Sequence, residues 1–222
     1  HQARRLLLCP ALAHEVFHSL VFAGRVDGAV IHAAQVGAAT SAWASQGAGD
    51  TYKDIVDAGV NPDLALTIAN IESGTSATAK NPNSSARGIF QVLDATWKEY
   101  GGTPENRNDP QAQAFIGARI IADYTNKLES ALGRPVEAHE VYLAHLLGPK
   151  GAETVLKADP AANILDVVRG YDAKNADAIV NNNGMRNLTV GEAIDKWRSR
   201  VERAQEQVAM ASPEKPVATP AE

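Results

Sequence analysis

Paired signals for the start and the end of helices recur from residue 61 to residue 201, and they limit the possible folds more than any other feature of the sequence. Asn61 can cap a helix whose first position is Pro62, and Gly74 can end it. Between them, apolar residues recur at helical spacing: Leu64, Ile68 and Ile71. We therefore predict a helix that begins at Pro62 and is stopped by Gly74.

Four further segments show the same kind of signals: residues 94–100, 109–133, 135–147 and 189–201. Asp94 and Asp109 are the predicted N-caps of two of them, and Thr189 with Glu192 forms a capping box. Aromatic residues make up only 5% of the chain, and alanine is abundant. This composition favours packed helices over a sheet sandwich. The predicted fold class is all-α or mostly α.

The chain of 222 residues suits one main domain with extensions. We predict a domain over residues 50–208, an apolar N-terminal segment of unknown role over residues 1–49, and a flexible tail with three prolines over residues 209–222. The apolar run after Arg4 and Arg5 is shorter than the about 7 to 15 residues of a secretion signal, and no stretch approaches the roughly 20 residues that span a bilayer. We therefore expect a soluble chain.

The net charge excludes some classes of partner. At −5, with a sequence pI near 5.7, the chain has no overall positive field toward nucleic acid or anionic lipid. Its single cysteine, Cys9, excludes an internal disulfide and a zinc cluster built from cysteines. We predict no cofactor, no nucleic-acid partner and no membrane span.

Glu72 is the unusual residue of the first predicted helix. It lies four positions after Ile68, on the apolar face, in the last turn before the chain enters a loop. Apolar surroundings disfavour the charged carboxylate, so the pKa rises toward the range that a general acid needs at neutral pH. Position alone would favour an ordinary solvated glutamate near a helix end. The residues that follow Glu72 favour catalysis.

Five sequence elements follow one another at compatible spacing: Glu72-Ser73, a polar loop with Asn81-Pro82, the pair Ser84-Ser85, Gly88-Ile89-Phe90-Gln91, and Thr96-Trp97. This order resembles the soluble lytic transglycosylase family, most closely its bacteriophage members, over roughly residues 50–200. The resemblance implies a lysozyme-like helical domain with a cleft between two lobes. It also implies that the substrate is peptidoglycan.

In that family a glutamate protonates the glycosidic oxygen between N-acetylmuramic acid and N-acetylglucosamine. It then takes the proton of the muramic C6 hydroxyl, so that a 1,6-anhydro sugar forms without water. Carried over to this sequence, Glu72 is this acid and base. The resemblance further implies that four nearby residues bind the substrate: Ser73, Ser85, Phe90 and Gln91. Gly88 would let the backbone pass close to the substrate or is a simple turn glycine, and Trp97 is expected in the core.

A third motif of the family, Ala-Tyr-Asn-x-Gly, is altered here to Ala144-His145-Leu146-Leu147-Gly148. The family tyrosine hydrogen-bonds near the catalytic glutamate, and His145 stands in its place. Tyr142 lies three residues earlier on the same helical face and offers a hydroxyl instead. The sequence leaves both candidates open, as well as the interpretation that both are ordinary residues of a packed helix.

Phage origin would imply a lysis enzyme or a virion component that opens the wall. The expected location is the phage virion or the host periplasm and cell wall, with peptidoglycan strands and other virion proteins as partners. Two alternatives keep the same fold: a lysozyme-type muramidase that hydrolyses the bond, and an inactive wall-binding virion module.

A competing motif lies near the N-terminus, where His14, Glu15 and His18 fit the H-E-x-x-H pattern of zinc peptidases. Such an enzyme places this helix after a sheet, but only thirteen residues precede His14. A third protein ligand is also required, and His32 or a later carboxylate would be a guess. We therefore predict no metal site and interpret the two histidines as members of an amphipathic helix.

Overall fold

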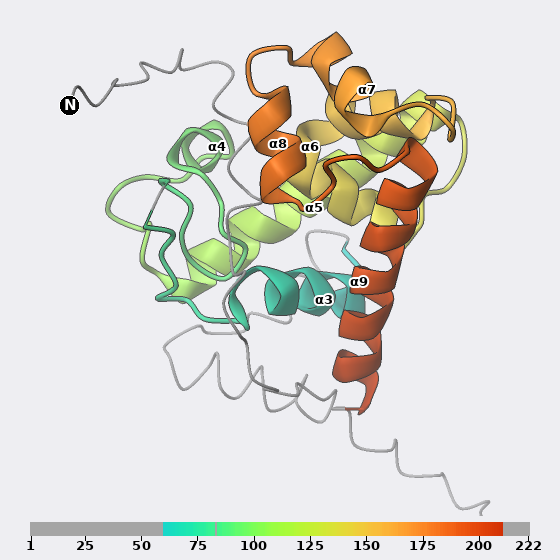
Figure 1. Cartoon of the computed structure of the whole chain (residues 1–222). Helices are drawn as coiled ribbons and strands as arrows, with labels where there is room; N and C mark the ends of the chain where they lie inside the picture. Colours follow the sequence, from blue (N-terminus) through green and yellow to red (C-terminus); the bar gives the residue numbers. More distant parts are fainter. Residues whose placement is uncertain (1–59, 83, 211–222) are drawn as a thin grey trace, which may run out of the picture.

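The computed structural model describes residues 60–82 and 84–210. Figure 1 shows their helices, which are α3 (Pro62–Ser73), α4 (Asp94–Glu99), α5 (Pro110–Leu132), α6 (Ala138–Leu156), α7 (Ile164–Tyr171), α8 (Ala176–Asn182) and α9 (Val190–Met210). In this part of the chain, β-pairing is limited to isolated bridges such as those that Arg87 makes with Lys80 and Val92. The prediction of an all-α fold is confirmed.

The ends of α3 follow directly from the sequence. The Asn61 side chain accepts a hydrogen bond from the backbone N–H of Asp63 at 2.8 Å, and Pro62 occupies the first helical position. Gly74 ends the helix in the left-handed conformation, with φ 59°, and its N–H donates to the Asn70 carbonyl. The predicted limits of α3 are confirmed, and they fix Glu72 in its last turn.

Two of the three other predicted helix N-caps are present in the structure. Asp109 caps α5, and the capping box of α9 is present because Thr189 and Glu192 each bond to the other's backbone N–H. Asp94 does not cap α4. It is the first residue of that helix, and its carboxylate is held by Arg87 and Arg107 instead.

Helix α6 differs from its predicted span of residues 135–147. It begins at Ala138 because Glu137 and Glu140 form a capping box. The expected stop at Gly148 is a kink, with φ 71° and ψ 161°, after which the helix continues to Leu156. Pro149 is compatible with this continuation because proline fits the first turn of a helical segment. The short helices α7 and α8 had not been predicted.

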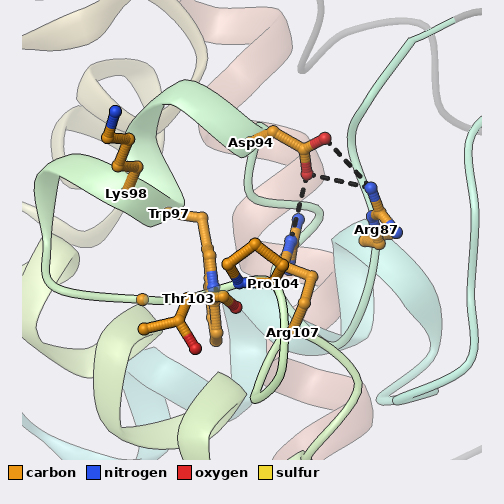
Figure 2. A pocket seen from close by; sticks show the side chains of 8 residues that line it. Arg87, Asp94, Trp97, Lys98, Thr103, Pro104 and Arg107 are labelled. Atoms are coloured by element: carbon orange, nitrogen blue, oxygen red, sulfur yellow. Dashed lines mark hydrogen bonds and ion pairs between the residues drawn. The ribbon is translucent and has the colours of Figure 1, made fainter.

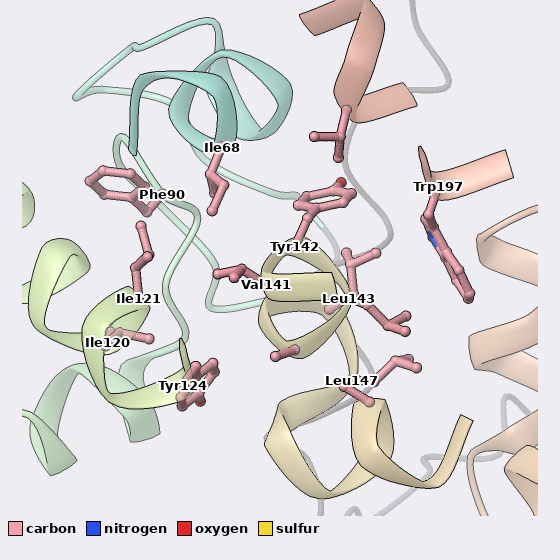
Figure 3. Packing of buried hydrophobic residues seen from close by; sticks show 14 of the residues in the cluster. Ile68, Phe90, Ile120, Ile121, Tyr124, Val141, Tyr142, Leu143, Leu147 and Trp197 are labelled. Carbon is pink, nitrogen blue, oxygen red and sulfur yellow. The ribbon is translucent and has the colours of Figure 1, made fainter. Parts of the chain in front are cut away.

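The helices pack around one hydrophobic core. Helix α5 lies against α6, and α9 contacts both α6 and α3, while α7 and α8 pair with each other (Figure 1). Figure 3 shows part of this core, with Ile68 of α3, Tyr142 of α6 and Trp197 of α9 among the residues drawn. The arrangement brings the C-terminal part of α3 against the middle of the fold, where it buries Glu72.

Some predictions concern residues outside the described ranges. The N-terminal segment 1–49 and its H-E-x-x-H residues His14, Glu15 and His18 are among them, as is most of the tail. Helix α9 runs to Met210, past the domain limit predicted at residue 208. In the part of the chain that the structure describes, no helix combines the length and the apolar character needed to cross a bilayer.

Candidate active site

Glu72 is buried in the last turn of α3, with 1% of its surface exposed. Burial disfavours the carboxylate and raises the pKa of Glu72 to about 8. Its Oε2 atom has no hydrogen-bond partner among the described residues, which is tolerable for a protonated carboxyl group and costly for a carboxylate. Glu72 therefore holds its proton at neutral pH, as a general acid must.

Two groups act against the effect of burial on Glu72. The positive charge of Arg200, on α9, lowers its pKa, and so does a hydrogen bond with the hydroxyl of Tyr142, on α6. The guanidinium of Arg200 also lies over the Tyr142 ring, 5.7 Å from its centroid. Both groups favour the carboxylate that remains once Glu72 has given up its proton. Three helices thus contribute to one acid–base group.

A second carboxylate is absent from the groups that shift the pKa of Glu72. Burial, Arg200 and Tyr142 account for the shift among the described residues. The arrangement is therefore one buried acid with a hydroxyl and a cation beside it. It can donate a proton, and it can accept one afterwards.

Tyr142 and His145, the two candidates for the place of the family tyrosine, make different contacts in the structure. The Tyr142 hydroxyl hydrogen-bonds to Glu72, and burial together with the Glu72 charge raises the pKa of Tyr142 well above its usual value, so the hydroxyl keeps its proton. The Nε2 atom of His145 lies 3.2 Å from the Phe90 carbonyl, and burial lowers the pKa of His145 to about 4. A neutral His145 can donate to that carbonyl. The geometry supports Tyr142 in the place of the family tyrosine.

Gln113 of α5 organises the loop between Glu72 and α4. Its side-chain carbonyl accepts from the Ile89 N–H at 3.0 Å, and its amide donates to the carbonyls of Ala77 and Arg107, each at 3.1 Å. Gly88 has φ 81°, and a Cβ at this position would meet the Gln113 side chain at 2.4 Å. The absence of a side chain at Gly88 therefore leaves room for the Gln113 side chain. The sequence alone did not indicate this role of Gln113, because Gln113 lies 24 residues from its partner Ile89.

The remaining predicted site residues bond to the same loop. The Ser73 hydroxyl donates to the Ile89 carbonyl at 2.7 Å, and the Gln91 amide donates to the Gly88 carbonyl at 2.9 Å. Gln91 itself is buried and has a positive φ of 48°. These two side chains fix the loop beside Glu72, and their contact with substrate stays a prediction.

Phe90 and Ser85 lie apart from Glu72's own contacts. The Phe90 side chain is in the core, where Figure 3 shows it with Ile68 and Ile121, and a Cβ on Gly117 would meet its ring at 2.1 Å. Ser85 is exposed and accepts a hydrogen bond from the Asp94 N–H at 3.2 Å. A substrate-binding role for either one also stays a prediction.

Trp97 is in the core, as predicted, with 3% of its surface exposed. Its indole N–H donates to the Thr103 carbonyl at 2.9 Å.

Residues 60–82 and 84–210 contain no group of three or more histidine, cysteine, aspartate or glutamate side chains placed to hold a metal ion.

A helical fold with a buried glutamic acid in the last turn of a helix, next to a tyrosine hydroxyl, fits the lysozyme-like class of enzyme. The model of the transglycosylase SLT domain family matches residues 53–163, which are 111 of the 222 residues. The chain belongs to this family. It is therefore a lytic transglycosylase-type enzyme, and its substrate is peptidoglycan. The match includes Glu72 and Tyr142 but ends before Arg200.

The charge of Arg200 predicts a measurable change in the pH dependence of activity. Because cleavage starts from protonated Glu72, kcat/KM is expected to fall as the pH rises through about 8. Replacing Arg200 by leucine removes a charge that lowers this pKa, so the alkaline limb of the profile should move to higher pH. Arg203→Leu is the matched control, since Arg203 is an exposed residue of the same helix. An unchanged limb in Arg200→Leu would contradict the assigned coupling.

Proposed function

We propose that the protein cleaves the β-1,4 bond between N-acetylmuramic acid and N-acetylglucosamine and releases a 1,6-anhydro product, with Glu72 as the catalytic acid and base. The observation that carries this proposal is the buried Glu72 carboxyl, whose pKa is raised to about 8 and whose neighbour is the Tyr142 hydroxyl. A proton held at neutral pH is what the departing sugar oxygen needs.

The residues suggest two successive steps. Glu72 first gives its proton to the glycosidic oxygen as the bond to C1 breaks. The C6 hydroxyl oxygen then bonds to C1, and its proton passes to the Glu72 carboxylate, which restores the starting state. Between the two steps Glu72 is negatively charged, and Tyr142 and Arg200 both favour that state. No water is consumed, which agrees with a site in which the acid is buried.

We further propose that the enzyme is phage-encoded and acts on the wall during DNA entry or lysis, in the virion or in the host periplasm. This rests on the resemblance of the region from Glu72 to Trp97 to the bacteriophage members of the family. Other virion proteins are proposed partners in the case of entry.

Zymography tests the proposed activity most directly. The renatured wild type is expected to clear a band in a gel that contains purified cell walls, and Tyr142→Phe should give a weaker band because Glu72 loses the hydrogen bond of its carboxylate form. A folded wild type that binds the walls but leaves the gel uncleared would establish the inactive binding module instead.

The H-E-x-x-H residues permit a separate test. If His14 and His18 are structural, alanine at both positions should leave the rate of wall cleavage within about a few-fold of wild type, and chelators should have no effect. The measurement is the loss of turbidity of a wall suspension with and without EDTA. Inactivation by EDTA that zinc reverses would support the metal hypothesis.

A further inference from the structure

A cavity of about 570 Å³ lies beside α4, and neither Glu72 nor Tyr142 lines it. Its lining residues come from α4, the loop that follows α4, and Arg87 (Figure 2): Arg87, Asp94, Trp97, Lys98, Gly102, Thr103, Pro104 and Arg107. The volume falls within the range of about 300 to 1,000 Å³ that is typical of small-molecule sites. The cavity is large enough for a ligand the size of a dipeptide.

Positive charge is in excess on the cavity lining. Asp94 is the one carboxylate among the lining residues, and it is shared by Arg87 at 3.0 Å and Arg107 at 3.2 Å. Lys98 adds a third cation. The chain as a whole carries a net charge of −5, so this local balance is opposite to that of the protein. An anion would complete the neutralisation that Asp94 begins.

Arg107 is a charged residue whose side chain is almost completely buried at the wall of the cavity. Its side chain is 4% exposed and stacks on the Trp97 ring, with the guanidinium carbon 4.5 Å from the ring centroid. Its other guanidinium nitrogens bond to Asp94 and to the Val92 carbonyl, while Nη1 has no partner among the described residues. A buried guanidinium whose charge Asp94 must share with Arg87 is incompletely compensated. It contributes positive potential at the wall of the cavity.

The rest of the lining is apolar or already bonded. Pro104 offers a carbon surface, whereas Trp97 is 3% exposed, lies under Arg107 and donates its indole N–H to the Thr103 carbonyl. Such walls suit a ligand that has an aliphatic part beside its negative charge. They suit a bare inorganic anion less well, because such an ion would lose hydration against carbon without compensation.

We propose that this cavity binds the carboxylate of a short peptide, and that its occupant is the peptide stem borne by the peptidoglycan strand. The choice of the stem as the source of the peptide rests on the proposed function. The carboxylate bonds to Arg87 at the rim, Lys98 adds positive potential from another part of the lining, and the aliphatic side chains lie on Pro104. The site would thus recognise the peptide part of a substrate whose sugar part is cleaved at Glu72.

Isothermal titration of the full chain tests the proposal without any requirement for cleavage. The probes are N-acetyl-D-alanyl-D-alanine, the same dipeptide with a C-terminal amide, and inorganic phosphate. The free acid is expected to bind, and the amide is expected to bind at least about tenfold more weakly because it lacks the charge. Equal binding of acid and amide, or phosphate binding as tight as the acid, would overturn the proposal.

Two variants locate the binding. Arg87→Gln combined with Lys98→Gln should lower the affinity for the free acid about tenfold or more, with a melting temperature close to wild type since Arg87 is partly exposed and Lys98 exposed. Lys150→Gln, an exposed lysine of α6 outside the cavity lining, is the matched control. Wild-type affinity in the double variant would place the peptide elsewhere and refute the proposal.

The proposed function and this inference can fail separately. Glu72→Gln is expected to bind the dipeptide as wild type does, because Glu72 is not part of the cavity. Dipeptide binding by a protein that cannot cleave walls would refute the function alone. Wall cleavage without dipeptide binding would refute the cavity assignment alone.

Discussion

Replacement of Glu72 by glutamine is expected to abolish wall cleavage, with a rate loss of at least about 10² to 10⁴. The amide can neither protonate the glycosidic oxygen nor accept the C6 proton, and one residue performs both steps. The measurement is the initial rate of release of soluble fragments from purified walls. The control is Glu206→Gln, an exposed position on α9. A Glu72→Gln variant with a tenth of wild-type turnover would refute the assignment.

The same variant should be more stable than wild type near neutral pH. The folded state binds the Glu72 proton up to about pH 8, whereas the unfolded chain releases it near pH 4.5. The folded pKa of this acid is raised, so the folded state is penalised progressively as the pH increases from 4.5 toward 8. At pH 7 the penalty is about 3 kcal/mol, and glutamine removes it. Urea unfolding at pH 5 and pH 8 measures the free energy of unfolding of both proteins. A decrease between these two pH values that is as large in the variant as in the wild type would contradict the prediction.

Digestion of peptidoglycan should yield anhydro-muropeptides, lighter by one water than lysozyme products, as the dominant species in mass spectra. A hydrolase needs a second carboxylate about 5 to 9.5 Å from the acid. Three carboxylates that follow Glu72 in the sequence have other roles or positions: Asp94 holds Arg87 and Arg107, Asp109 caps α5, and Glu99 is exposed on α4. The sugar's own hydroxyl is therefore the expected nucleophile.

Asp94→Asn is the informative variant for this prediction. The sequence predicted Asp94 as the N-cap of α4, a position that asparagine fills about as well as aspartate, but the structure shows Asp94 paired with two arginines. The variant should lose some stability through those pairs, while the product stays the anhydro sugar. Reducing-end products from the wild type, together with an inactive Asp94→Asn, would make the protein a lysozyme-type hydrolase.

Local signals predicted most of the helical framework. Asn61, Pro62 and Gly74 are read correctly because a cap and a stop act on their own neighbours within a few residues. The position of Glu72 on the apolar face of α3 likewise predicted its burial. Asp94 was misread because a side chain ahead of a helix looks the same whether it caps the helix or pairs with a distant arginine.

Residues whose roles depend on distant partners escaped prediction. Gln113 bonds to Ile89, which precedes it by more than twenty residues. Arg200 lowers the pKa of Glu72, which lies near the other end of the described sequence. Neither belongs to a short motif, and each looks like an ordinary polar residue of a long helix. The choice between Tyr142 and His145 also required the fold, since both lie on one face of α6.

The contact between α3 and α9 determines when the site can form. The Asn70 amide donates to the Gln207 side chain across 137 residues of sequence, and Val201 and Val208 of α9 enter the same core as Ile68. Contacts of such long range carry a large loop-closure entropy and slow the folding of a domain. During synthesis on the ribosome, the catalytic helix emerges early but waits for nearly the whole domain before α9 can cover it. Arg200 arrives in that same last segment, so nascent chains hold Glu72 without its electrostatic partner.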